Sequence, residues 1–308
     1  MAKDYSYRAD HIGGLIRPPA LEEAHRHYAR GEIEIARLRD IEDAAIKAAV
    51  DMQRSVGLAV TTDGGFRRDG GGALKFDGST LAKTEAESLR ALSRARPIKV
   101  AVPAPRPAPG ELPDRALAEA AVVKREIEAL IAAGVDYIQL DAPGYLTATG
   151  RPQQTLGALL QIDAAILSGI DRHGNVRIAV HFAHGPDPAD LGRSTFADAV
   201  AEQVFTALAA DRFIVPMGGG GTDFELLRFV PAGKLAVLGL IDAAQPALES
   251  VDEVMARIDE AAKCIDGESL ALSPRHGFVA MTAVSEAEQL RKLELVVEVA
   301  TRWWGFAM

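Results

Sequence analysis

Histidine and aspartate side chains stand at the ends of several apolar runs in this sequence. The four that carry the main expectation are Asp63, Asp141, His181 and His276. An imidazole can accept and release protons near neutral pH, and a carboxylate can orient it or help it to bind a divalent metal. We expect these four residues to be catalytic, with His181 and His276 acting either as an acid–base pair or as metal ligands.

Further polar residues follow the same apolar runs and are candidates for contact with a substrate. They are His11, Arg17, Arg67, His184 and Asp242. The planar guanidinium of arginine can hold a carboxylate or phosphate through two hydrogen bonds, so Arg17 and Arg67 predict a small anionic substrate. We interpret Arg68 instead as a surface charge that is balanced by Asp69 or Glu22.

The elements that must position these residues alternate along the chain between strand-length apolar runs and helix-length amphipathic segments. Strands are predicted at Arg8–Ile12, Leu58–Asp63, Ile98–Pro103, Tyr137–Asp141, Arg177–His181, Arg212–Met217, Leu235–Asp242 and Leu270–Pro274. Helices are predicted at Glu32–Val56, Leu81–Arg94, Pro113–Ala133, Gln154–Arg172, Phe196–Ala210, Val251–Cys264 and Ser285–Arg302. Eight strands with crossover helices favour an α/β fold of the (β/α)8 TIM barrel type, formed by residues 1–308 as a single domain, over an open sheet. Its active site would lie at the carboxyl ends of the strands, where the candidate residues stand.

Two loops have unusual composition. The glycine run Gly218–Gly221 could line an anion site ahead of a helix near Asp223, or it could simply be a flexible turn. The segment Pro103–Gly110 contains too many prolines for a helix or a central strand, so we predict a stiff surface loop.

Composition excludes several classes of partner. The formal net charge is −9 and no basic patch occurs, which argues against nucleic-acid binding. No apolar run is long enough to cross a membrane, and the single cysteine, Cys264, rules out an internal disulfide, so a cytoplasmic location is expected. The aromatic segment Trp303–Phe306 would pack under the barrel or contact a second subunit, and we expect a homodimer.

The order of the strand-end motifs resembles that of one known family, the catalytic domain of cobalamin-independent methionine synthase and its shorter single-barrel relatives. The motifs are His11–Pro18, Thr62–Arg68, Tyr137–Pro143, Val180–Gly185 and Leu272–Phe278, and together they extend over nearly the whole chain. The resemblance implies a barrel in which zinc binds the thiol of homocysteine and a methyl group arrives from a methylated folate.

The sequence departs from this family at the residues that carry its reaction. His181 matches a zinc ligand, but Ala183 and His276 replace two ligand cysteines, and Met217 replaces a glutamate, so we place Met217 among the substrate contacts. Gly65 and Ala142 replace carboxylates that the family would use near its amino-acid substrate. Soft thiolate ligands keep a zinc-bound thiolate reactive, so the family's own route is not expected here.

Three functions follow from these patterns. The leading prediction is a methionine-synthase-like enzyme for a small anionic organic substrate, which transfers a methyl or alkyl group or cleaves a bond through His181 and His276. The second is a methyltransferase whose zinc is held by these two histidines and a carboxylate. More generally, a metal site could join the two histidines with Asp141, His11 or His184. The third is a ligand-binding barrel without catalysis.

Overall fold

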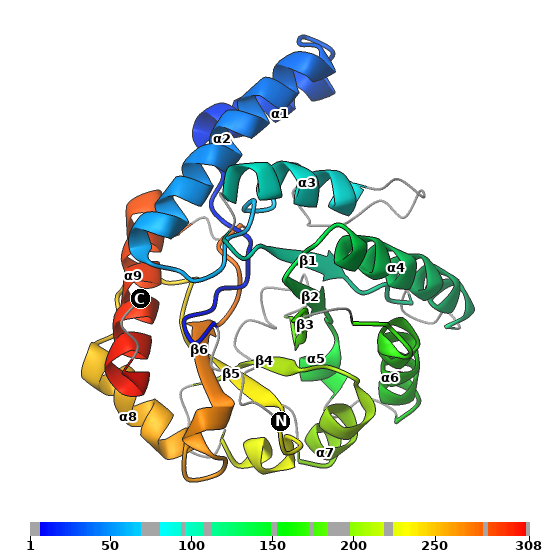
Figure 1. Ribbon diagram of the computed structural model, residues 1–308, viewed down its shortest axis with the longest axis vertical. Helices are drawn as coiled ribbons and strands as arrows, with labels where there is room; N and C mark the ends of the chain where they lie inside the picture. Colours follow the sequence, from blue (N-terminus) through cyan, green and yellow to red (C-terminus); the bar gives the residue numbers. More distant parts are fainter. Residues whose placement is uncertain are drawn as a thin grey trace.

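The computed structural model describes residues 7–68, 81–93, 96–107, 113–148, 153–172, 175–183, 198–218, 224–279 and 283–305. Within these residues six parallel strands are hydrogen-bonded in chain order. They are β1 Lys99–Pro103, β2 Tyr137–Asp141, β3 Arg177–His181, β4 Arg212–Pro216, β5 Leu235–Ile241 and β6 Leu270–Pro274. Figure 1 shows them at the centre of a ring of helices.

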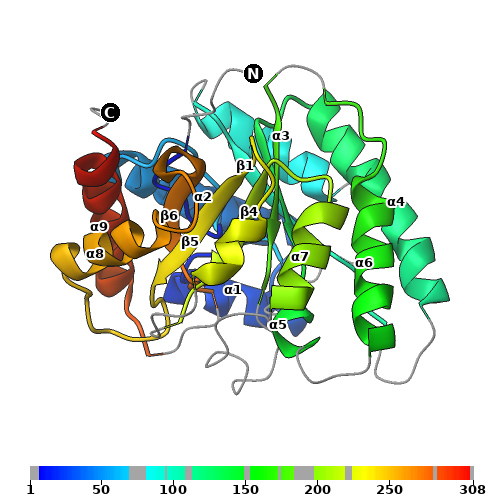
Figure 2. The same cartoon turned by 90° about the horizontal axis from the view of Figure 1, so that it is seen from below.

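The helices follow most of the predicted segments. They are α1 Pro19–Ala29, α2 Ile35–Val56, α3 Leu81–Ser93, α4 Asp114–Ala132, α5 Tyr145–Ala148, α6 Gln153–Leu167, α7 Asp198–Ala207, α8 Val251–Ala261 and α9 Glu286–Trp304, with 3-10 helices at Glu225–Phe229 and Gly267–Ser269. Figure 1 shows α1 and the first part of α2 extending beyond the ring, and Figure 2 shows α4, α6 and α7 on one side with α8 and α9 on the other. None of these helices in the described part of the chain combines the length and apolar character needed to span a bilayer.

Local chemistry explains where several helices begin and end. Ser250 and Ser285 each accept a hydrogen bond from the third helical residue and form capping boxes at the starts of α8 and α9. Gly57 ends α2 with a left-handed φ of 96°. The helix that we predicted to reach Arg172 ends at Leu167, shortly before Gly169 with its φ of 65°.

The first two predicted strands, Arg8–Ile12 and Leu58–Asp63, close the ring without forming regular strands. The first closing segment joins the sheet through a parallel bridge between Ala9 and β6. The second joins it through a parallel bridge between Thr61 and the residue before β1. The structure therefore differs from the predicted eight regular strands at these two segments. The predicted TIM barrel itself is confirmed.

Side chains replace strand hydrogen bonds in the second of these segments. The amide of Gln53 on α2 accepts from the N–H of Thr62 and donates to its carbonyl oxygen, both at 2.9 Å. The hydroxyl of Thr62 donates to the carbonyl oxygen of Gly13 at 2.9 Å, which ties the two closing segments together. Because the backbone of Thr62 is satisfied in this way, it needs no neighbouring strand.

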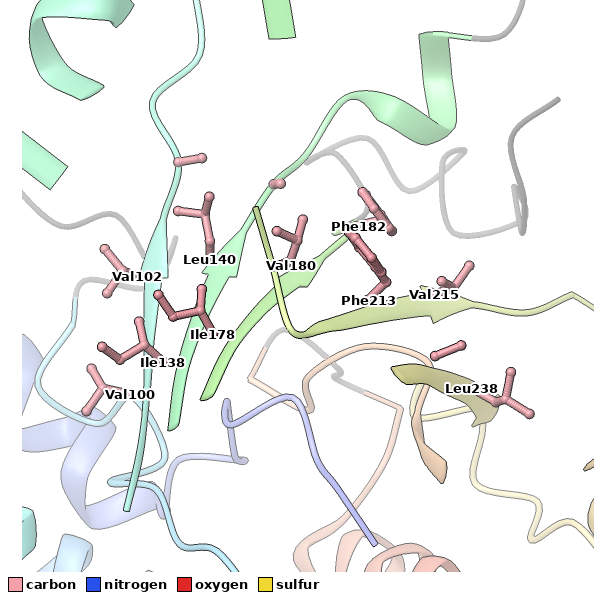
Figure 3. Packing of buried hydrophobic residues seen from close by; sticks show 14 of the residues in the cluster. Val100, Val102, Ile138, Leu140, Ile178, Val180, Phe182, Phe213, Val215 and Leu238 are labelled. Atoms are coloured by element: carbon pink, nitrogen blue, oxygen red, sulfur yellow. The ribbon is translucent and has the colours of Figure 1, made fainter. Parts of the chain in front are cut away.

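Two apolar cores lie on the two faces of the barrel wall. Alternate strand residues point outwards and pack against the helices, among them Val100, Leu140 and Val180, which Figure 3 shows in one continuous cluster. A smaller cluster fills the inside of the barrel and includes Val60 and Ile214. The barrel is thus a packed core rather than a pore, and polar chemistry is confined to its ends.

Buried polar and aromatic side chains fill the end of the barrel where the strands begin. The ammonium of Lys99 donates to Asp10 Oδ1 at 2.8 Å, and the hydroxyl of Tyr137 donates to Asp10 Oδ2 at 2.6 Å. The guanidinium of Arg212 lies over the rings of Tyr7 and Tyr137. These residues stand far along the strands from the carboxyl ends, so they belong to the structural end of the barrel.

The C-terminal tryptophans pack against their own chain. The indole N–H of Trp303 donates to Asp259 of α8 at 2.8 Å, and that of Trp304 donates to the carbonyl oxygen of Gly267 at 3.1 Å. The guanidinium of Arg8 lies 5.5 Å from the centre of the Trp304 ring. Both indoles thus contact elements of the same chain, α8 and the 3-10 helix at Gly267–Ser269. The predicted homodimer stays a prediction.

Candidate functional site

His181 and Asp141 meet because they are register partners at the ends of the neighbouring strands β3 and β2. The imidazole Nδ1 lies 2.8 Å from Asp141 Oδ1, and the side chain of His181 is only 4% exposed. The carboxylate can only accept, so Nδ1 carries a hydrogen, and in the neutral imidazole Nε2 keeps its lone pair. This Nε2 is buried and has no hydrogen-bond partner among the described residues. The arrangement presents a basic nitrogen at the carboxyl ends of the strands.

Asp63, Arg68 and Glu85 form a second polar group at this end. The N–H of Gly65 donates to Asp63 Oδ1 at 2.9 Å, while Asp63 Oδ2 is buried without a partner among the described residues. Arg68 pairs with Glu85 of α3 at 2.9 Å, and both side chains are buried. Our interpretation of Arg68 as a surface charge is therefore wrong.

Electrostatic interactions link this group to the pair formed by His181 and Asp141. Burial lowers the pKa of Arg68, but the carboxylates of Glu85, Asp63 and Asp141 outweigh burial and leave the pKa raised. Burial, supported by Asp63, raises the pKa of Glu85 above its ordinary value although Arg68 opposes the change. Arg68 therefore lies within electrostatic range of the strand-end carboxylates Asp63 and Asp141.

His276 and Asp242 form a separate pair beyond the ends of β6 and β5. Nε2 of His276 lies 3.7 Å from Asp242 Oδ1, which is an ion-pair distance and too long for a hydrogen bond. The His276 imidazole, helped by the N–H of Ala244 and by Arg275, holds the pKa of Asp242 at about 2 despite partial burial. Asp242 is thus an anion at neutral pH.

The two arginines predicted to anchor a substrate are bound to the protein itself. Arg17 donates to the carbonyl oxygens of Gly65 and Arg68 and so fixes the loop after the second closing segment. Arg67 pairs with Asp43 of α2 and donates to Ser88 of α3 at 3.1 Å. Their role as substrate anchors stays a prediction that these contacts do not favour.

The remaining candidates have different surroundings. His11 is fully buried, and burial together with Lys99 lowers its pKa to about 4, so it is neutral at pH 7. Met217 belongs to the outer hydrophobic cluster between the strands and the helices. His184 and the glycines after Gly218 lie outside the described residues. Substrate contacts by His11, Met217 and His184 stay predictions.

An ion pair outside the barrel wall holds the loop that follows Asp141. Arg106 binds Asp163 of α6 through two hydrogen bonds of 2.7 and 2.8 Å, and its Nε donates to the carbonyl oxygen of Pro143 at 2.7 Å. The hydroxyl of Tyr145 donates to the same carboxylate at 2.7 Å. The proline-rich loop after β1 is therefore fixed to the site as far as it is described.

Sequence reasoning missed Glu85 and Gln139 and assigned Arg68 to the surface. Gln139 donates to Asp141 Oδ1 at 2.7 Å. Its position two residues before Asp141 in a strand places both on the same face, so alternation along β2 could have identified it. Glu85 arrives from a helix whose contact with the site no local pattern indicates.

A TIM barrel with ionisable side chains gathered at the carboxyl ends of its strands is an architecture typical of enzymes. Residues 103–302 match the family described as "Cobalamin-independent synthase, Catalytic domain". The chain therefore belongs to the catalytic-domain family of the cobalamin-independent methionine synthases.

Similar proteins cover almost the whole chain. The uncharacterized protein YxjH of Bacillus subtilis (strain 168) is 29% identical, over 97% of this chain and 95% of its own. The crystal structure of a putative vitamin-B12 independent methionine synthase from Listeria monocytogenes is 25% identical, with a TM-score of 0.81 over 97% of this chain and 98% of its own. A B12-independent methionine synthase from Shewanella sp. W3-18-1, 19% identical with a TM-score of 0.69 over 96% of this chain and 97% of its own, shares the fold.

The described residues do not fit the zinc centre of this family. Ala183 offers no donor atom where the resemblance implies a cysteine, and Met217 is packed in the outer core. His181 is bound to Asp141 and His276 lies beside Asp242, and in the described part of the chain no three His, Cys, Asp or Glu side chains are grouped as a metal site requires. The predicted zinc site stays a prediction.

Proposed function

We propose that the protein is an enzyme that transfers a methyl or other alkyl group to a small thiol substrate, with His181 as the general base. The observation that carries this proposal is the 2.8 Å contact between His181 Nδ1 and Asp141, which leaves a buried, unpartnered Nε2 at the carboxyl end of β3. Membership of the methionine-synthase family supports the transfer reaction. A histidine base replaces the activation that zinc and its thiolates would supply.

The proposed step balances without a further reactant. Nε2 of His181 accepts the proton of the substrate thiol, and the resulting thiolate attacks the alkyl carbon of the donor. A sulfur–carbon bond forms while the bond between that carbon and the donor breaks, and the donor leaves with the electron pair. Asp141 stabilises the imidazolium that appears on His181. General-base catalysis of this kind contributes about 10²–10⁴-fold in rate.

The surrounding charges indicate which substrate would suit the site. Arg68 offers a cation for an anionic group. Its buried Nε has no hydrogen-bond partner among the described residues, as is also true of Arg17 and Arg67. The pKa of Arg68, however, is raised against its burial by Glu85 and by the strand-end carboxylates Asp63 and Asp141. Asp63 Oδ2, also without such a partner, would accept a hydrogen bond from a donor group of the same molecule. A small thiol that carries both an anionic group and hydrogen-bond donors, as a thiol amino acid does, meets these requirements. The proposed anion contact thus moves from Arg17 and Arg67 to Arg68.

The test is an assay of purified protein with homocysteine and other small thiols in the presence of methylated folate and simpler methyl donors. We expect a methylated thiol as product, and a loss of at least about 100-fold in kcat/KM for His181→Ala and Asp141→Asn. His27→Ala, which alters a histidine on the exposed helix α1, is the matched control and should retain full activity.

Other products would favour the other predicted functions. Cleavage of the thiol compound without transfer would replace the transferase by a lyase that uses the same base. Stoichiometric zinc that is lost from the His181→Ala protein would favour the rebuilt metal site. Saturable binding without turnover would favour a ligand-binding barrel, and full activity of His181→Ala would end the proposal.

A further inference from the structure

Gln139 lies directly beneath the histidine–aspartate pair inside the barrel. It is two residues before Asp141 in β2, so both side chains point to the inner face, and Gln139 is fully buried. Its amide nitrogen donates one hydrogen to Asp141 Oδ1 at 2.7 Å and the other to the carbonyl oxygen of Ile12 at 2.9 Å. The amide therefore connects the first closing segment with the carboxylate that binds His181.

The chemistry of the two partners fixes the orientation of this amide. The carbonyl oxygen of Ile12 and the carboxylate of Asp141 can only accept hydrogen bonds, so a reversed amide would place its oxygen against two acceptors. In the observed orientation both hydrogens are used, and Oε1 is buried without a partner among the described residues. A buried acceptor without a donor is unfavourable, whereas an apolar side chain of similar size would carry no such cost.

Asp141 Oδ1 is thus held from two sides. It accepts from Gln139 at 2.7 Å and lies 2.8 Å from His181 Nδ1. A carboxylate free to rotate would not keep one oxygen opposite Nδ1, and a neutral imidazole would then exchange its hydrogen between the two ring nitrogens. The orientation of Asp141 decides which nitrogen is basic.

We propose that Gln139 is a positioning residue that fixes Asp141 and thereby keeps His181 in the tautomer with the hydrogen on Nδ1. It does not touch the substrate in this scheme and acts only through Asp141. The proposal rests on the proposed function only for the use of Nε2 as a base, because the tautomer itself can be observed without a substrate.

The test is nitrogen NMR of the full chain labelled with ¹⁵N-histidine, with the His181 signals assigned from the His181→Ala protein. We expect the Nδ1–H tautomer to exceed the other by about tenfold or more in the wild type, and the ratio to fall to within about threefold of unity in Gln139→Leu. Gln53→Leu is the matched control, because it removes another buried glutamine, one that is hydrogen-bonded to the backbone of Ala49 and Thr62 and not to Asp141. Its His181 ratio should equal that of the wild type.

A second variant tests the same idea with an unchanged side-chain size. In Gln139→Glu the introduced carboxyl can donate to Asp141 only while it is protonated, so the tautomer ratio should fall as the pH rises. A wild-type ratio in both Gln139 variants would overturn the proposal. Full transfer activity of His181→Ala would instead defeat the proposed function and leave the tautomer result standing.

Discussion

The two buried histidines at the carboxyl ends of the strands differ in how they meet their aspartates. His181 lies at hydrogen-bond distance, 2.8 Å, from Asp141, whereas 3.7 Å separates His276 from Asp242. The shorter contact leaves Nε2 of His181 without a partner among the described residues, whereas Nδ1 of His276 lies 3.3 Å from the carbonyl oxygen of Gly277 and its Nε2 faces Asp242. We therefore assign the base to His181, while the role of His276 in catalysis stays a prediction.

Arg68 and Arg67 are neighbours that pair with different helices, Arg68 with Glu85 of α3 and Arg67 with Asp43 of α2. This difference gives a prediction for substrate binding. Arg68→Gln should raise KM for an anionic thiol substrate by about 10–100-fold, because a charged hydrogen bond contributes about 1.5–3 kcal/mol. Arg67→Gln should leave KM within about threefold of the wild-type value, since that guanidinium is paired with Asp43 and hydrogen-bonded to Ser88. Steady-state kinetics on both folded variants decide the matter, and equal effects on KM would remove Arg68 from the substrate site.

His11 gives a second prediction, for the effect of pH on stability. Burial, with the nearby Lys99, lowers its pKa from 6.5 to about 4 in the folded protein. Between these pH values the unfolded chain binds a proton that the native protein does not, so the free energy of unfolding falls as the pH falls from 6.5 to 4. The shift corresponds to about 3 kcal/mol.

Urea denaturation at pH 6.5 and pH 4 measures this effect. The decrease in the free energy of unfolding should be about 3 kcal/mol larger for the wild type than for His11→Asn. His27→Asn, an exposed histidine, should behave like the wild type. An identical pH dependence in the wild type and His11→Asn would contradict the pKa of His11.

The sequence could predict that His181 lies beside Asp141 but not that Arg68 pairs with Glu85. The reason is that only the first two residues lie in regular strands. Asp141 and His181 end two regular strands, so the sheet register brings them together once the strands are known. Arg67 and Arg68 follow a segment that ends in the glycines Gly64 and Gly65, where no regular alternation assigns a side chain to one face. Which arginine turns inward depends on α3, through Glu85.

At the scale of elements, the sequence predicted well those strands whose backbone hydrogen bonds go to neighbouring strands. β2, β3 and β6 have the predicted bounds, and β1, β4 and β5 differ by a single residue at one end. The segment at 58–63 was predicted as a strand because it is apolar, but Gln53 of α2 satisfies its backbone at Thr62. A side chain that replaces a strand neighbour leaves no signal in the hydrophobic pattern.

The close approach of β4, β5 and β6 around Gly239 gives a third prediction. A methyl group at Gly239 would lie 3.1 Å from the Cα of Pro216 and 3.0 Å from the Cα of Arg275, both backbone atoms that cannot rotate away. We expect Gly239→Ala to lower the free energy of unfolding by about 1–3 kcal/mol, as overpacking does. It should also disturb Arg275 and the adjacent His276.

Gly157 on α6 supplies the matched control, because nothing lies within 4 Å of a methyl group built there. Gly157→Ala should stabilise the protein by about 0.5–1 kcal/mol, since alanine favours helix. Denaturant unfolding of the two variants compares them directly. A Gly239→Ala protein as stable as the wild type would show that the three strands can separate without cost.

At the scale of the whole molecule, the barrel closes where backbone pairing is weakest. Between β6 and β1 only single bridges join the two closing segments to the sheet, and buried side chains add the remaining connections. Figure 1 shows the first segment passing beside β6 near the centre of the ring. The stability of the closed ring should therefore depend on a few polar side chains, unlike that of the strands β2 to β5.

Lys99 is one of the side chains that hold this closure. Its ammonium donates to Asp10 Oδ1 at 2.8 Å and to the carbonyl oxygen of His11 at 2.6 Å, so it ties β1 to the first closing segment. Burial raises the pKa of Asp10, but Lys99 outweighs burial and leaves it lowered. Lys99→Met would leave a fully buried carboxylate without its counter-ion, which costs about 3–5 kcal/mol.

Hydrogen exchange and urea denaturation test this prediction together. Lys99→Met should lose about 3–5 kcal/mol of stability, and the N–H of Asp10, which donates to Leu272 at 2.8 Å, should lose more protection than amides of β2 and β3. Lys47→Met removes an exposed lysine paired with Asp51 and should change stability by no more than about 0.5 kcal/mol. A uniform loss of protection would mean that the ring unfolds as one unit. A loss of protection confined to the closing segments would mean that the barrel opens there first. That is the side where the first closing segment contacts Gln139, which in turn holds Asp141 beside His181.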